Sequence, residues 1–141
     1  MSTIISMRWL QRVLRLAAVL AAIAMPLGLF YGGAQPVAVD LIQEPWDKFA
    51  HAGVFAILAG AIGYASGLRG ARVWWLAFLG AMAVGVMDEW HQAYLPGRAA
   101  GWDDLLADAA GSALGATALR SPTRARIKRW IEKKLVSHHS G

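Results

Sequence analysis

The sequence predicts an all-α membrane protein, a bundle of four transmembrane helices followed by a C-terminal basic amphipathic helix. Of the 141 residues, 57% are hydrophobic and only 16% are charged, and the mean hydropathy is +0.40. Soluble domains carry about 45–50% apolar and about 25% charged residues, so this composition argues against an ordinary soluble enzyme. Long uncharged runs and a one-sided distribution of Lys and Arg support the same class.

Two transmembrane spans follow from the uncharged runs at residues 16–39 and 49–68. At 1.5 Å per residue, each run is long enough to cross a hydrocarbon core of roughly 30 Å. The runs at 73–87 and 109–119 reach that length only if neighbouring acidic residues enter the membrane, and short or re-entrant segments remain the alternative. We therefore predict one transmembrane domain, residues 1–120, with helices at about 13–33, 48–67, 72–92 and 101–119.

The basic residues predict the orientation of these helices. All of the 14 Lys and Arg residues except Lys48 and Arg98 fall before the first span, between the second and third, or after the fourth. The positive-inside rule then places both termini in the cytoplasm. The net charge of +5 is explained as an orientation signal, which argues against a nucleic-acid partner.

The two ends of the chain have specific features. Residues 8–24 resemble a secretory signal peptide, but the uncharged run continues to Val39, which favours an uncleaved helix. Residues 121–141 form a predicted cytoplasmic tail, where Ser121-Pro122 is typical of a helix start and apolar residues recur at helical spacing among basic ones. Such a helix is expected to lie on anionic lipid headgroups.

The acidic residues show the opposite asymmetry, because all nine except Glu132 belong to the predicted outer half. The helical rise places those of the second, third and fourth helices at similar depth. Three i, i+4 pairs each share one helix face: Asp47 with His51, Asp88 with Gln92, and Asp104 with Asp108. A charged group in hydrocarbon costs at least about 2.5–3.5 kcal/mol, so these faces are expected to meet in one polar site.

We divide the members of this predicted site by chemical role. Asp47 is one turn from His51 and is expected to orient its imidazole. Glu89 and Asp103 are expected nearer to the surface, as solvated charges. The candidates for acid–base catalysis are His51, Asp88, Asp104 and Asp108. The candidates for ligand binding are Asp47, Lys48, Glu89, Gln92 and Arg98.

A metal cofactor is an open question at this point. The carboxylates and His51 offer oxygen-rich ligation suited to a divalent cation such as Mg²⁺ or Ca²⁺. A zinc site is poorly supported, because the chain has no Cys and no second His near His51. The absence of Cys also excludes disulfides and cysteine nucleophiles, and no other nucleophile motif is present.

Four short motifs in a fixed order resemble the VanZ-like family of small bacterial integral membrane proteins. They are Asp47-Lys48-Phe49-Ala50-His51, Asp88-Glu89-Trp90-His91-Gln92, Pro96-Gly97-Arg98, and the segment from Asp104 to Gly111 that contains Asp108. The resemblance covers roughly residues 40–116, and the family pattern often has Asn at the position of Asp108. It implies a cell-envelope membrane protein, because one family member is associated with resistance to the glycopeptide antibiotic teicoplanin. Most other members have no assigned biochemical activity.

Three classes of function are compatible with these observations. The first is a site in the outer leaflet that acts on or binds a lipid-linked or lipidated envelope molecule, with antibiotic resistance as a linked phenotype. The second is a non-catalytic membrane scaffold or partner-binding protein whose buried polar cluster is structural. A proton or ion pathway ranks last, because the inner halves of the predicted helices are apolar. The sequence leaves open whether any reaction is catalysed.

Overall fold

The computed structural model describes residues 2–38, 42–43, 45–98 and 101–120. Its elements are α1 (Ser2–Gly33), a 3-10 turn η1 (Pro36–Ala38), α2 (Trp46–Ser66), α3 (Ala71–Gln92) and α4 (Trp102–Arg120). The part of the chain so described contains helices and no strand, as the composition predicts. The predicted basic tail, residues 121–141, lies outside the described residues.

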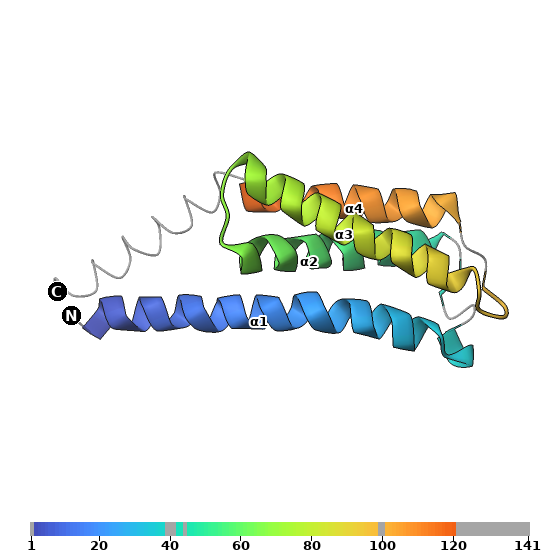
Figure 1. Cartoon of the computed structure of the whole chain (residues 1–141), viewed down its shortest axis with the longest axis horizontal. Helices are drawn as coiled ribbons and strands as arrows, with labels where there is room; N and C mark the ends of the chain where they lie inside the picture. The colour runs from blue at the N-terminus through green and yellow to red at the C-terminus, as the bar shows by residue number, and fades with distance from the viewer. Residues whose placement is uncertain (1, 39–41, 44, 99–100, 121–141) are drawn as a thin grey trace.

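Seven of the eight predicted helix boundaries agree with the structure to within two residues, whereas the start of the first helix is wrong. The helix α1 begins at Ser2 and not near residue 13. The prediction placed the start of this helix close to the uncharged run that begins at residue 16, although Leu, Gln and Arg are good helix formers that extend a helix into water. The N-terminal part of α1 accordingly projects beyond the ends of the other three helices (Figure 1).

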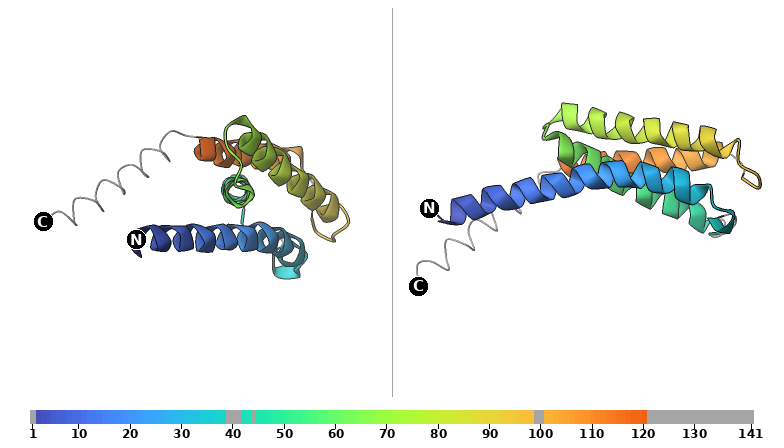
Figure 2. Two further views of the ribbon diagram at one scale, coloured as in Figure 1. Left: turned by 60° about the vertical axis from the view of Figure 1, so that its left-hand side comes forward. Right: turned by 60° about the horizontal axis from the view of Figure 1, so that its bottom comes forward.

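The helices α2, α3 and α4 pack against one another, and α1 contacts α2 and α3 from the side. Figures 1 and 2 show α2 between α1 and the pair formed by α3 and α4. Segment Arg8–Gly33 of α1, together with α2 and α3, is long and apolar enough to cross a membrane, so the chain is a multi-pass membrane protein. Among the described helices, α4 does not meet that criterion, because Asp103, Asp104 and Asp108 lie in it.

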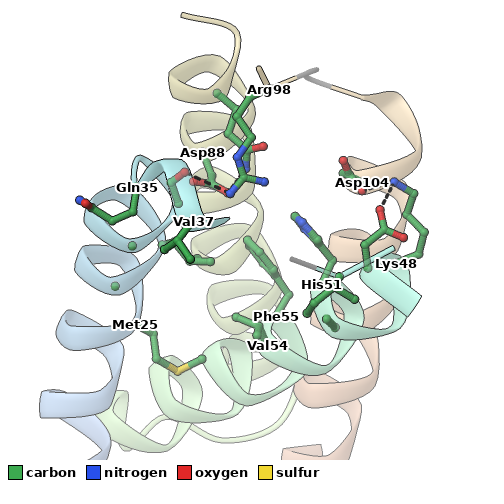
Figure 3. A pocket seen from close by; sticks show the side chains of 18 of the residues that line it. Met25, Gln35, Val37, Lys48, His51, Val54, Phe55, Asp88, Arg98 and Asp104 are labelled. Atoms are coloured by element: carbon green, nitrogen blue, oxygen red, sulfur yellow. Dashed lines mark hydrogen bonds and ion pairs between the residues drawn. The ribbon is translucent and has the colours of Figure 1, made fainter. Parts of the chain in front are cut away.

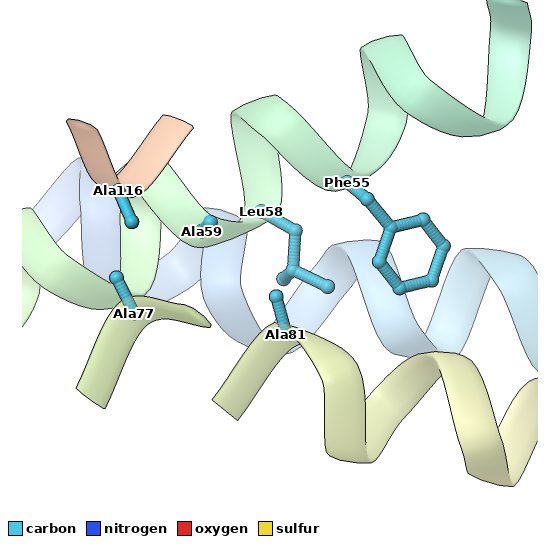
Figure 4. Packing of buried hydrophobic residues seen from close by; sticks show 6 residues of the cluster. All are labelled: Phe55, Leu58, Ala59, Ala77, Ala81 and Ala116. Atoms are coloured by element: carbon cyan, nitrogen blue, oxygen red, sulfur yellow. The ribbon is translucent and has the colours of Figure 1, made fainter. Parts of the chain in front are cut away.

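The apolar core is built largely from small side chains. Phe55, Leu58 and Ala59 of α2 meet alanines of α3 and α4, namely Ala77, Ala81 and Ala116 (Figure 4). Small residues allow helix backbones to approach closely where lipid provides no hydrophobic driving force for association. The large apolar side chains are instead exposed along the outer faces, as lipid-facing positions of a membrane protein require.

The GxxxG pattern formed by Gly111 and Gly115 lies at the contact between α2 and α4. A Cβ added at Gly111 would meet the carbonyl group of Ala52, and one added at Gly115 would meet that of Ala56. Only glycine permits such an approach of the two backbones. This contact sets the distance and rotation of α4 against α2, and hence the position of the acidic residues that precede Gly111 on α4.

Candidate functional site

The polar side chains of three helices meet at one end of the bundle. They come from the first turns of α2, the last turns of α3 and the first turns of α4. The buried residues of α3 are apolar near the start of the helix and polar near its end. The apolar ones include Val73, Ala77 and Ala81, and the polar ones are Asp88, Glu89 and Gln92. The described acids of α2, α3 and α4 thus lie together at this end of the bundle, whereas Asp40 and Glu44 lie outside the described residues.

Lys48 is surrounded by three carboxylates. Its Nζ lies 2.7 Å from Asp47 Oδ2, 2.9 Å from Asp103 Oδ2 and 2.6 Å from Asp104 Oδ1. The side chain of Asp103 is 59% exposed, in agreement with the solvated position predicted for it, whereas that of Asp104 is only 12% exposed. The ammonium group thus compensates charge on α2 and α4 together and ties the starts of these helices to each other.

His51 is paired with Asp108 and not with Asp47. Its Nδ1 lies 2.9 Å from Asp108 Oδ1, and Asp108 is completely buried. The prediction that Asp47 orients the imidazole is therefore wrong, because the carboxylate of Asp47 is engaged by Lys48. Helical spacing identifies neighbours on one helix, but the close contact of α2 and α4 brings a better-placed acceptor from another helix.

Glu89 is a buried member of the cluster. It is 8% exposed, and its Oε2 accepts a hydrogen bond of 2.8 Å from the backbone N–H of Gly101. The expectation that Glu89 is a solvated charge near the surface is wrong, because the backbone N–H of Gly101, directly before α4, lies against this carboxylate. The sequence has no signal for this contact, which depends on how α3 and α4 pack against each other.

Asp88 and Gln92 share one face of α3, as their i, i+4 spacing predicts. Gln92 Nε2 donates a hydrogen bond of 2.8 Å to Asp88 Oδ2, one turn away on α3, and both residues are buried. The amide partly compensates the buried carboxylate without adding charge. Their side chains form part of a cavity wall.

A cavity of about 1120 Å³ lies between α1 and the first half of α2 and the last half of α3. One part of its wall is polar and includes Lys48, His51, Asp88, Arg98 and Asp104, as Figure 3 shows. The rest is apolar or formed by glycine backbone, with Met25, Gly28, Leu29, Val54 and Phe55. The wall is therefore amphipathic, with the charged groups gathered at one end.

Arg98 connects this cavity to α1. Its Nη2 donates a hydrogen bond of 3.0 Å to the carbonyl oxygen of Gly33, the last residue of α1. A basic side chain at a helix C-terminus satisfies a carbonyl that has no partner within the helix. Arg98 Nε is buried and has no hydrogen-bond partner among the described residues. Arg98 thus holds α1 in place and retains a free N–H group.

Two residues on which the sequence interpretation placed no role complete the surroundings of Asp108. Gly85 of α3 faces this carboxylate, since a Cβ there would lie 2.8 Å from Asp108 Oδ2. Ser112, one turn after Asp108 on α4, is fully buried and its hydroxyl has no partner among the described residues. The sequence offered one signal for Ser112, because it is a polar residue four positions after Asp108 on the same helix. The sequence offered no such signal for Gly85.

Three side chains of the described residues lie close enough to one another to bind a single metal ion. His51, Glu89 and Asp108 each offer a ligand atom, and these atoms all lie within 4.8 Å of one another. Asp88 and Asp104, which the sequence also suggested as oxygen ligands, are outside this group and are bonded to Gln92 and Lys48. The His51–Asp108 pair has in addition the arrangement of an imidazole held by a carboxylate, which suits proton transfer.

The fold and the site together define a small multi-pass membrane protein with a buried polar cluster beside an amphipathic cavity. The chain belongs to the VanZ/LLP1 family, whose family model matches residues 7–123. This match confirms the resemblance inferred from the four motifs and extends it over α1. No curated protein and no solved structure matches the chain significantly.

Proposed function

We propose that this protein binds a lipid-linked or lipidated molecule of the cell envelope in the outer leaflet of the bacterial inner membrane. The observation that carries the proposal is the amphipathic cavity, whose polar wall suits a headgroup and whose apolar wall suits a hydrocarbon chain. At about 1120 Å³ it is slightly larger than the usual small-molecule site, which measures about 300–1,000 Å³.

The proposed orientation places this cavity outside. In it, α4 is the fourth span, because its buried acids face α2 and α3 and its 19 residues nearly match the thickness of the hydrocarbon core. Both termini are then cytoplasmic, as the distribution of Lys and Arg indicates. The polar end of the bundle thereby lies in the outer leaflet, where lipid-linked envelope molecules are exposed.

Arg98 in the polar wall offers a binding position for an anionic group of a ligand. Arg98 has an unpartnered Nε, and a guanidinium suits phosphate or carboxylate. Lys48 adds positive potential nearby, although three carboxylates surround it. A polyprenyl or acyl lipid phosphate combines such a group with a chain that matches the apolar wall. If a reaction follows binding, His51 held by Asp108 is the acid–base pair that the geometry offers.

A second candidate function is a non-catalytic scaffold whose polar cluster locks the helices together. The ion pairs of Lys48 with three carboxylates favour the scaffold, because they join α2 to α4 and need no ligand to do so. The two proposals differ in the cavity, which a scaffold does not need. Filling the cavity without disturbing the polar cluster therefore separates them.

Gly28 allows such a test. It lines the cavity from α1, and a Cβ added there meets no atom within 4 Å, so Gly28→Leu places a side chain in the cavity without a clash. Gly53→Leu on α2 is the matched control, since Gly53 is exposed, equally open and not part of the cavity wall. Both substitutions replace a helical glycine by a better helix former.

Binding of a polyprenyl phosphate to the purified chain in detergent is measured by native mass spectrometry, with a zwitterionic phospholipid as competitor. We expect Gly28→Leu to weaken binding by at least about tenfold, which corresponds to about 1.4 kcal/mol, and Gly53→Leu to leave it unchanged. Equal binding by both variants, with unchanged melting temperatures, supports the scaffold.

A role in glycopeptide resistance is also a proposal for this chain, suggested by the family. A protein that binds lipid-linked envelope molecules changes which of them are available at the outer surface. We expect expression in a susceptible host to lower susceptibility to teicoplanin, and Gly28→Leu to abolish that effect while Gly53→Leu preserves it. An equal effect of both variants would separate resistance from the cavity.

A further inference from the structure

The polar end of the bundle has more acidic than basic side chains, and four of the acids, Asp88, Glu89, Asp104 and Asp108, are buried. Its described residues include two permanently cationic side chains, Lys48 and Arg98, against the six carboxylates of Asp47, Asp88, Glu89, Asp103, Asp104 and Asp108. Among the described residues, Asp108 is paired with the imidazole of His51, which is positive only when protonated, and Glu89 accepts a hydrogen bond from a backbone N–H. A carboxylate without a full positive partner is costly to bury in a membrane protein, so a cation beside these two side chains would be favourable.

Three carboxylate oxygens of this region are buried and have no hydrogen-bond partner among the described residues, namely Asp47 Oδ1, Glu89 Oε1 and Asp108 Oδ2. Asp108 is completely buried and Glu89 is 8% exposed, and neither Asp108 Oδ2 nor Glu89 Oε1 has a hydrogen-bond partner in the described chain. The other oxygen of each group is held in place, by His51 and by the N–H of Gly101. A buried oxygen that is held in place but has no hydrogen-bond partner is unusual in a folded protein, and its lone pairs are available to a ligand.

The spacing of the three side chains fits a single ion. Adjacent ligands of an octahedral ion at about 2.1 Å lie about 3 Å apart, and opposite ligands about 4.2 Å apart. His51 Nδ1 and Asp108 Oδ1 are 2.9 Å apart, and the ligand atoms of His51, Glu89 and Asp108 all lie within 4.8 Å of one another. Small rotations of the side chains therefore bring all three onto one ion.

We propose that His51, Glu89 and Asp108 together bind one divalent first-row metal ion of the Mn²⁺ or Zn²⁺ class. Two carboxylates balance the charge of the ion, and an imidazole ligand favours this class over Mg²⁺ and Ca²⁺, which prefer oxygen ligands throughout. Gly85 provides the room that Asp108 needs beside α3. His51 also lines the cavity, so the ion lies beside the cavity wall.

The test titrates Mn²⁺ into the purified full-length chain after treatment with EDTA, and follows free Mn²⁺ by electron paramagnetic resonance. We expect one ion per chain, displaced by Zn²⁺ more readily than by Ca²⁺. Glu89→Gln and Asp108→Asn should each weaken binding by at least about tenfold, because each removes a charged ligand. Asp103→Asn is the matched control and should bind as the natural sequence does, because Asp103 is an exposed acid on the same helix as Asp108.

A second measurement uses the natural sequence, so its result does not depend on whether the variants fold. In the natural sequence, saturating Mn²⁺ should raise the melting temperature above that of the EDTA-treated chain, because an ion that binds only the folded state stabilises it. The proposal is overturned if Mn²⁺ neither binds nor raises the melting temperature, or if Asp103→Asn weakens binding as much as Asp108→Asn does. Gly28→Leu should retain Mn²⁺ binding, so failure of the lipid proposal is distinguishable from failure of this one.

Discussion

His51 of α2 and Asp108 of α4 form a 2.9 Å hydrogen bond between residues 57 positions apart in the sequence. Asp108 is completely buried, and its second oxygen faces Gly85 of α3. Three helices therefore meet at one carboxylate. The following experiments test what holds this end of the bundle together and how it faces the membrane.

Asp108→Asn should leave a folded protein. The amide retains an oxygen for the contact with His51, and a neutral group costs less to bury than a carboxylate. In the presence of EDTA we expect a melting temperature equal to that of the natural sequence or higher by a few degrees, measured by tryptophan fluorescence in detergent. Asp108→Leu, which leaves His51 without its partner, should cost about 1–3 kcal/mol. Loss of folded protein with Asn alone would show that the negative charge itself is structural.

Gly111→Ala should destabilise the bundle. The added Cβ meets the carbonyl of Ala52 and forces α2 and α4 apart, for which we expect a cost of about 1–3 kcal/mol in chemical unfolding. Gly53→Ala is the control, because it occupies open space on α2 and should be neutral or slightly stabilising. Equal stability of the two variants would mean that the close α2–α4 contact does not persist in detergent.

Lys48→Met should lower the melting temperature by on the order of 5 °C, because it leaves three carboxylates facing one another. High salt should recover part of the loss by screening that repulsion. Lys48→Arg, which keeps the charge, should remain close to the natural sequence. An unchanged melting temperature for Lys48→Met at low salt would contradict a structural role of the ion pairs.

Arg98→Gln should weaken binding of a lipid phosphate by about 1.5–3 kcal/mol, the contribution of a hydrogen bond to a charged group. It should also loosen the C-terminal end of α1, because Arg98 donates to the carbonyl of Gly33. Hydrogen exchange of the last turn of α1 reports the second effect without any ligand. Arg98→Lys should recover part of the binding only, since Lys lacks the planar pair of donors. Faster exchange with unchanged lipid binding would assign Arg98 to the helix contact alone.

Cysteine labelling in intact cells tests the orientation. The chain contains no Cys, and residues Gln43 and Leu68 are exposed at opposite ends of α2. A membrane-impermeant thiol reagent should label Gln43→Cys from outside, whereas Leu68→Cys should react only after permeabilisation. Labelling of Leu68→Cys in intact cells would place the polar end of the bundle in the cytoplasm.

Composition, uncharged runs and helical periodicity were sufficient to predict the membrane-protein class, the approximate bounds of three helices and the layer in which the acids lie. The pair Asp88 and Gln92 was predictable, because both residues belong to one helix and the i, i+4 relationship is local. The same reasoning paired His51 with Asp47 and left Glu89 in solvent, and both interpretations were wrong.

Only the tertiary structure decided which partners meet across helices. The helical rise determines the depth of a residue, but it does not determine how one helix is rotated against the next. That rotation depends on packing, here on the approach of Gly111 and Gly115 to the carbonyl groups of α2. Because this contact brings Asp108 to His51 and turns its other oxygen toward α3, the candidate metal ligands assemble from residues that no local spacing connects.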